Sequence, residues 1–114
     1  MKRTLLAARS ALVALFGAAI VLGAAGARDA SAGKTIYSNK CMICHGADGE
    51  GATGYAKAMG LQPARMSSDR VQNKTDAELK KIILDGSGKM KPVKGLSEAD
   101  IDNVIAYVRT FRKK

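Results

Sequence analysis

The 114-residue sequence contains no tryptophan, two prolines, two cysteines and a single histidine. After the first 32 positions its only aromatic residues are Tyr37, Tyr55, Tyr107 and Phe111, so large side chains for a core are scarce. A domain of this size buries a modest fraction of its surface, and such small scaffolds commonly need a disulfide, a metal or another group to complete them. We therefore expect a non-protein component in the core.

Long hydrophobic runs are also missing, apart from one near the start. Three basic residues stand among the first nine, the apolar run 11–25 follows, and small residues come next at 25–27 (Ala-Gly-Ala) and 30–32 (Ala-Ser-Ala). A basic start, a short apolar run and a small-residue cut site are together typical of a secretory signal peptide. The run is shorter than the ~20 apolar residues that a membrane-spanning helix needs, so we expect removal rather than anchoring.

Two cut sites fit this pattern, one after Ala27 and one after Ala32. We favour Ala32, because a few polar residues then separate the apolar run from the cut. The prediction is a signal peptide at 1–32 and one exported domain at 33–114, located in the periplasm and without stable membrane insertion. That domain has eleven lysines and four arginines against nine acidic residues, which gives a net charge of +6.

Segments that alternate polar and apolar residues with a period of two are missing, so we expect no β-strand. Residues 33–44 have apolar positions at helical spacing and predict a first helix, which the glycine-rich loop 46–54 follows. The segment 55–70 supports only short helical turns, because Gly60 and Pro63 interrupt it.

Two later helices carry clear start signals. Thr75 with Glu78, and Ser97 with Asp100, both match the capping-box pattern. Gly86 suits the left-handed position that ends the first of these helices. The second helix has an apolar stripe at helical period, formed by Ile101, Val104, Ile105, Val108 and Phe111. These elements predict an all-α domain.

The only histidine and both cysteines lie together in the sequence CMICH, residues 41–45. A structural zinc site needs four ligands, usually as two pairs from distant parts of the chain, and no second Cys/His cluster exists here. A thioredoxin-like redox pair opens a helix beside a βαβ unit, which this sequence lacks. A structural disulfide across so few residues removes little chain entropy, and neither kind of disulfide accounts for His45.

The pattern Cys-x-x-Cys-His is typical of covalent c-type haem attachment. Cys41 and Cys44 lie one helical turn apart, so that both thiols can add to the two vinyl groups at one edge of a porphyrin. His45 then lies against the ring face as the proximal iron ligand, and Gly46 leaves room for the chain to turn away. We predict one covalent haem c, which completes the small core.

From residue 33 onward the sequence resembles the small class I monohaem cytochromes c of bacteria, which include the c5, c6 and c553 types. The similar stretches are GKTIYSNKCMICHGADGEG, TDAELKKIILDGSGKM and LSEADIDNVIAYVRTF. They match the family's opening helix, the helix that leads into its methionine loop, and its C-terminal helix. The resemblance implies the class I cytochrome c fold, three to five helices wrapped around the haem, with Tyr107 meeting the 33–37 face of the first helix.

The resemblance also implies a methionine as the second axial ligand of the iron. Met90 occupies the matching position, whereas Met42 lies between the cysteines, and Met59 and Met66 are expected to fill gaps in the core. The family usually places a proline directly after this methionine. Here one residue separates Met90 from Pro92, a departure that bears on the strength of the iron–sulfur bond.

Histidine and methionine ligation raises the reduction potential of a haem iron, and no catalytic acid, base or oxyanion arrangement stands near His45. We therefore predict an electron-transfer protein rather than an enzyme, a one-electron carrier between redox proteins of a respiratory or dehydrogenase chain. The other hypothesis is a haem sensor, or a module that reacts with peroxide or small ligands at an open or labile sixth site.

The positive charge fits docking of a monomer onto acidic redox partners, because a lysine-rich face steers the encounter. It fits a merely solubilising surface equally well. The lysines that would border the haem are Lys40, Lys89, Lys91 and Lys94. Nucleic acid is not expected as a partner, since the basic residues form no patch interleaved with aromatics.

Overall fold

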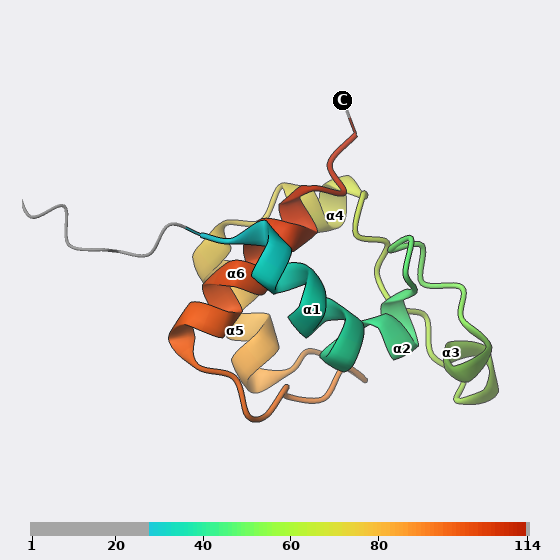
Figure 1. The fold of residues 1–114 in the computed structure, drawn as a ribbon. Helices are drawn as coiled ribbons and strands as arrows, with labels where there is room; N and C mark the ends of the chain where they lie inside the picture. Colours follow the sequence, from blue (N-terminus) through green and yellow to red (C-terminus); the bar gives the residue numbers. More distant parts are fainter. Residues whose placement is uncertain (1–27, 114) are drawn as a thin grey trace, which may run out of the picture.

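The computed structural model describes residues 28–113, and their regular structure is helical (Figure 1). The helices are α1 (Ala30–Lys40), α2 (Met42–His45), α3 (Gly54–Ala58), α4 (Asp69–Gln72), α5 (Asp76–Asp85) and α6 (Glu98–Arg109). The predicted all-α class is confirmed, and the count exceeds the expected three to five because α2 and α4 are single turns. Residues 1–27 of the predicted signal peptide lie outside the described part of the chain. None of the helices between residues 28 and 113 has the length and apolar character needed to cross a bilayer.

Helix α1 begins at Ala30, three residues before the start at 33 that the sequence predicted. The physical reason is Asp29, whose side chain caps the helix by accepting hydrogen bonds from two backbone N–H groups of the first turn. The helix stops just before Cys41, whose φ of −117° departs from helical values. The single helix expected over 33–44 is therefore two helices joined at Cys41.

Both predicted capping boxes are present. At the start of α5, Thr75 Oγ1 accepts from the Glu78 N–H at 3.1 Å, and Glu78 Oε2 accepts from the Thr75 N–H at 2.7 Å. Ser97 and Asp100 make the same reciprocal pair at the start of α6. Gly86 ends α5 with a φ of +77°, but its ψ of 175° is extended rather than left-handed helical, because the chain turns directly into the next loop.

Helices α1 and α6 cross at the centre of the fold (Figure 1). Gly33 permits this crossing, since a Cβ there would lie 1.9 Å from the carbonyl oxygen of Asn103 and 3.0 Å from Tyr107 Cβ. The rings of Tyr37 and Tyr107 pack edge to face with centroids 5.2 Å apart, and Phe111 lies against both. The prediction that Tyr107 meets the first helix is confirmed.

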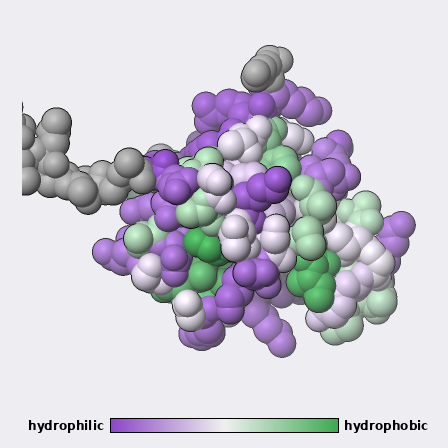
Figure 2. All heavy atoms as spheres, in the orientation of Figure 1, coloured by the Kyte–Doolittle hydropathy of each residue, from purple (hydrophilic) through white to green (hydrophobic). Residues whose placement is uncertain are grey.

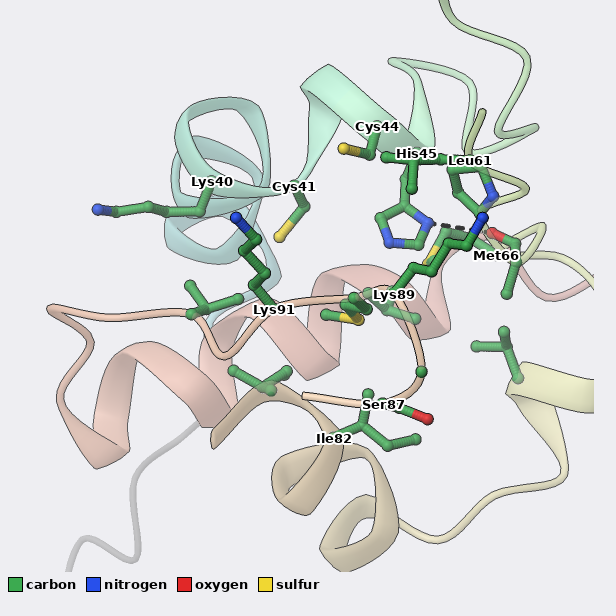
Figure 3. Close-up of a pocket in the computed structure, with 18 of the residues that line it drawn as sticks. Lys40, Cys41, Cys44, His45, Leu61, Met66, Ile82, Ser87, Lys89 and Lys91 are labelled. Atoms are coloured by element: carbon green, nitrogen blue, oxygen red, sulfur yellow. Dashed lines mark hydrogen bonds between the residues drawn. The ribbon is translucent and has the colours of Figure 1, made fainter. Parts of the chain in front are cut away.

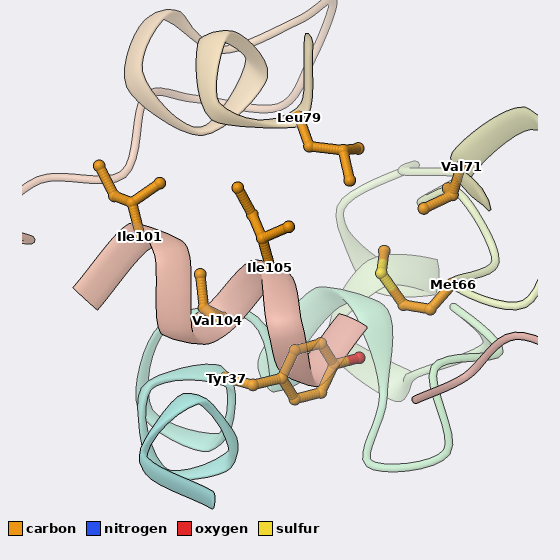
Figure 4. Close-up of a cluster of buried hydrophobic side chains, with 7 residues drawn as sticks. All are labelled: Tyr37, Met66, Val71, Leu79, Ile101, Val104 and Ile105. Atoms are coloured by element: carbon orange, nitrogen blue, oxygen red, sulfur yellow. The ribbon is translucent and has the colours of Figure 1, made fainter. Parts of the chain in front are cut away.

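The buried core is small and lies between α1, α4, α5 and α6 (Figure 4). Its members are Tyr37, Met66, Val71, Leu79, Ile101, Val104 and Ile105. Met66 is 7% exposed and fills the core as predicted. The same prediction for Met59 is wrong: this residue ends α3 at the periphery of the fold and is 57% exposed.

Candidate functional site

A cavity of about 1110 Å³ separates the CMICH motif from the loop that follows α5. Cys41, Cys44 and His45 lie on one side of it, and Ser87, Lys89 and Lys91 of that loop lie on the opposite side (Figure 3). Apolar side chains of α5 and α6 form the inner wall, namely Leu79, Ile82, Ile83, Val104, Ile105 and Val108. The volume exceeds the roughly 300–1,000 Å³ of ordinary small-molecule sites, so the cavity has room for a large apolar cofactor.

The two cysteines are free thiols, and both line the cavity. Burial raises the pKa of the Cys41 thiol to about 11, and the neighbouring Cys44 adds to the rise. A Cys-x-x-Cys pair that exchanges disulfides has, by contrast, a thiol whose pKa is lowered. The environment of Cys41 therefore opposes the redox-disulfide hypothesis.

His45 lines the cavity, and one of its ring nitrogens makes a hydrogen bond. Its Nδ1 lies 3.1 Å from the carbonyl oxygen of Ala64, and Nδ1 must be the donor because a carbonyl oxygen only accepts. Burial lowers the pKa of His45, an effect that the hydrogen bond to Ala64 partly opposes. A neutral ring with its proton on Nδ1 leaves the Nε2 lone pair available to a metal. The sequence analysis missed Ala64, since a backbone carbonyl carries no residue-type signal.

Two side-chain hydroxyls fix the backbone around the motif. Tyr37 donates to the carbonyl oxygen of Gly46 at 2.7 Å, and burial raises the pKa of this phenol well above its usual range, so it remains a donor. Thr53 Oγ1 donates to the carbonyl oxygen of Ile43 at 2.8 Å and accepts from the Ala56 N–H at 3.0 Å. The turn that carries Cys44 and His45 is thus tied to both α1 and α3.

The segment that carries Ala64 packs against the loop that follows His45. The Met66 N–H donates to the carbonyl oxygen of Gly49 at 2.8 Å, and a Cβ on Gly49 would lie 2.9 Å from Met66 Cβ. A Cβ on Gly51 would lie 2.7 Å from the Pro63 carbonyl oxygen. The predicted glycine-rich loop therefore has a packing role, because only residues without a Cβ allow the acceptor of the His45 hydrogen bond to come so close.

Met90 lies in a tight hairpin turn. Ser87 and Met90 exchange two backbone hydrogen bonds, each 2.9 Å long, with Gly88 at the tip at a φ of +55°. The Val93 N–H donates to the Ile83 carbonyl oxygen at 2.8 Å and fastens the far end of the loop to α5. The half-buried Met90 lines the cavity, in the wall opposite the CMICH motif.

Pro92 packs on this hairpin although it does not adjoin Met90 in sequence. A Cβ on Gly86 would lie 2.9 Å from Pro92 Cδ and 2.5 Å from the Met90 carbonyl oxygen. Gly86 is thus a close-packing position between the end of α5 and both residues.

Positive charge and exposed apolar groups surround the cavity. Lys40, Lys89, Lys91 and Lys94 are all exposed and line it. Tyr55 and Met59 also line the cavity and are 46% and 57% exposed. A hydrophobic patch lies over α2 (Figure 2), where Ile43 is 58% exposed. A rim of this kind combines charges that steer a partner with apolar surface that a partner can cover.

The donor set fits a covalently attached haem. Two free thiols stand one turn apart, a neutral imidazole has its Nε2 unengaged, and a thioether lies in the opposite wall. Haem iron in proteins takes such imidazole and thioether ligands, and the apolar inner wall suits the porphyrin face. The predicted haem residues Cys41, Cys44, His45 and Met90 are thus brought together around one cavity.

This chain is similar to several known proteins. The sequence model of a family described as cytochrome c oxidase, cbb3-type, subunit III matches residues 28–108. Cytochrome c-554(547) of Halothiobacillus neapolitanus is 42% identical over 91 residues, which cover 75% of this chain and 100% of that protein. Among solved structures, the KustC0563 c-type cytochrome has a TM-score of 0.60 and 26% identity, and the match covers 71% of this chain and 98% of that one.

Proposed function

This chain belongs to the c-type cytochromes, and we propose that it is a periplasmic one-electron carrier with His45 and Met90 as axial haem ligands. As a member of the family it binds haem c covalently, takes part in electron transfer, and has redox proteins as partners. The observation that carries the proposal is the cavity in which the CMICH motif faces the loop of Met90.

Cys41 and Cys44 hold the haem through two thioether bonds in this proposal, and His45 binds the iron through Nε2. The hydrogen bond from Nδ1 to Ala64 supports this assignment, because it fixes the tautomer and the orientation of the ring. The Tyr37 and Thr53 hydroxyls support it further, since they hold the backbone on either side of the motif.

We assign Met90 as the sixth ligand because its loop lies opposite the CMICH motif, although Met59 and Met66 also line the cavity. Met66 is buried in the core, and Met59 is more than half exposed at the end of α3. Met42 lies between the cysteines, is 38% exposed and is not part of the cavity wall. Thioether sulfur is soft and uncharged, so it favours ferrous iron and raises the reduction potential. The Ser87–Met90 hairpin supports the assignment by holding the backbone of Met90 at the cavity.

The haem supplies the one-electron chemistry, and the chain supplies ligation, burial and a docking surface. Ligands held by rigid backbone stay in place in both oxidation states, so little rearranges when an electron moves. The exposed lysines around the cavity support docking of the monomer onto acidic redox proteins. The N-terminal export pattern supports a periplasmic location.

Optical spectra of the exported protein, ferric and ferrous, with and without carbon monoxide, test the proposal directly. We expect haem that resists extraction by acidified solvent, a low-spin spectrum with a sulfur-to-iron charge-transfer band, and no response to carbon monoxide. Ready uptake of carbon monoxide would contradict secure Met90 ligation and favour the sensor or small-ligand-reactive haem module instead.

Met90→Ala and Met59→Ala form a matched pair of variants, since both methionines line the cavity. Met90→Ala should lose the charge-transfer band and bind carbon monoxide. Its reduction potential should fall by a sizeable fraction of the roughly 0.8 V range over which axial ligands set haem potentials. Met59→Ala should leave all three properties near those of the wild type. A reversed pattern would assign the sixth ligand to Met59.

A further inference from the structure

The described chain starts with two residues that are part of the fold. Asp29 Oδ1 accepts from the N–H groups of Ser31 and Ala32 at 2.9 and 3.1 Å and so caps α1. The Asp29 N–H donates to Asn103 Oδ1 at 2.9 Å, which ties the cap to α6. The Asp29 carbonyl oxygen accepts the first helical hydrogen bond, from Gly33 at 2.9 Å.

Arg28 belongs to a second network. Its guanidinium pairs with the carboxylate of Asp76, at the start of α5. Asp76 also accepts from Arg109 at 2.7 and 3.2 Å, and Arg109 donates in addition to the carbonyl oxygens of Lys74 and Gln72. Arg28 therefore connects the beginning of α1 to the first turn of α5 and the last turn of α6.

Cleavage after Ala27 and cleavage after Ala32 have different effects on these contacts. Cleavage after Ala32 would remove both residues and put a new α-ammonium group on Gly33, which is buried under the Asn103 carbonyl. This cut would remove the Asp29 cap of α1, and a positive charge at a helix N-terminus opposes the helix dipole. Cleavage after Ala27 puts the ammonium on Arg28, which is exposed, and keeps every contact.

We propose that the mature protein begins at Arg28, so that a signal peptidase cuts between Ala27 and Arg28 rather than after Ala32. Water hydrolyses this peptide bond, which leaves a carboxylate on Ala27 and an ammonium group on Arg28. The small residues Ala25 and Ala27 supply the recognition pattern. The match of the family model from residue 28 onward supports the same start. This inference rests on the proposed export of the chain.

Intact-mass measurement of the haem-loaded protein, expressed with its complete N-terminus and recovered from the periplasm, tests the cut site. We expect the mass of residues 28–114 plus one haem. A mass of residues 33–114 plus one haem would overturn the inference and leave the electron-carrier proposal intact. A mass that retains residues 1–27 would overturn both the cut site and the removal of the leader.

The variant Asp29→Ala distinguishes the two candidate cut sites by an independent measurement. Asp29 remains in the mature protein if the cut follows Ala27 and is removed if the cut follows Ala32. We expect the mature variant to show the Asp-to-Ala mass change and to melt about 4–8 °C lower than the wild type, as loss of a helix cap predicts. A mature protein with unchanged mass and unchanged Tm would place Asp29 in the removed segment and overturn the inference.

The same substitution at the two candidate positions gives a matched pair. Ala27→Gln should block the normal cut and accumulate the precursor, because glutamine is too large for the small-residue pattern. Ala32→Gln should yield a mature chain that still starts at Arg28. Normal processing of Ala27→Gln together with precursor accumulation in Ala32→Gln would contradict the proposal.

Discussion

At the scale of single residues, the haem site depends on groups that act through backbone atoms. Ala64 contributes its carbonyl oxygen to His45, and Gly46 contributes its carbonyl oxygen to Tyr37. Neither position needs a particular side chain for this contact. The chemically active residues of the motif are therefore easy to recognise in the sequence, whereas the atoms that orient them are not.

Asp76 provides a test of pH dependence at this scale. Hydrogen bonds from Arg109 and then from Arg28 lower the pKa of its carboxyl, so the ionised form favours the folded state. This stabilisation is present above the unfolded pKa of about 3.9 and is lost as pH falls through the lower folded value. Asp76→Asn should lower Tm by a few degrees at pH 7, and the difference should vanish towards about pH 2.

Thermal unfolding followed by circular dichroism between pH 7 and pH 2 measures this effect. Asp69→Asn is the matched control, because Asp69 is an exposed residue in the first turn of the neighbouring α4. A constant difference between Asp76→Asn and the wild type at every pH would show that the carboxylate charge is not the cause.

At the scale of elements, the close crossing of α1 and α6 depends on Gly33, which has no Cβ. Gly33→Ala would force its Cβ to within 1.9 Å of the Asn103 carbonyl oxygen, which is backbone and has little freedom to move. Overpacking of this kind costs about 1–3 kcal/mol or more, so chemical denaturation should show a clear loss of stability. Gly54→Ala is the control, since nothing lies within 4 Å of its Cβ position. Equal stability of the two variants would rule out a tight crossing.

The methionine loop makes a second prediction at this scale. Gly86→Ala would place a Cβ 2.5 Å from the Met90 carbonyl oxygen, so the hairpin must shift and the proposed bond between Met90 and the haem iron should weaken. We expect a lower midpoint potential and measurable binding of carbon monoxide to the ferrous protein. Gly88→Ala is the control in the same loop, because its φ is also positive but nothing lies within 4 Å. Identical potentials in the two variants would mean that Gly86 packing does not position Met90.

At the scale of the whole molecule, a small helical core lies beside one large cavity. Seven residues form the buried cluster, and several of them also line the cavity, among them Tyr37, Met66 and Leu79. The covalent haem c of this family therefore completes a core that the amino acids leave unfinished. The haem in the core explains why so few large side chains suffice in this sequence.

The positions of the lysines predict how fast the protein associates with acidic redox partners. Lys91→Glu and Lys34→Glu change the net charge equally, but only Lys91 lines the cavity. Lys91→Glu should slow electron transfer with an acidic redox protein several-fold at low salt and flatten its dependence on ionic strength. Stopped-flow absorbance measures both quantities. Equal slowing by the two variants would indicate a net-charge effect without a docking surface at the cavity.

Local patterns in the amino-acid sequence predict the features that depend on near neighbours in the chain. The two capping boxes, the loop glycines and the Cys-x-x-Cys-His spacing all act within a few residues, so local patterns specify them. The same locality made the all-α class and the haem predictable.

Other features of the fold and the site depend on contacts between residues that are far apart in the sequence, and these became visible in the three-dimensional structure. Arg28 pairs with Asp76 of α5, and the Asp29 N–H donates to Asn103 of α6, so residues far apart in the sequence fix the N-terminal segment on the fold. Met59 is exposed because it lies at the periphery of the fold, although its side chain is hydrophobic. Ala64 likewise reaches His45 because two glycines let separate segments approach. Such contacts join residues many positions apart, and their partners are often backbone atoms, which no local pattern encodes.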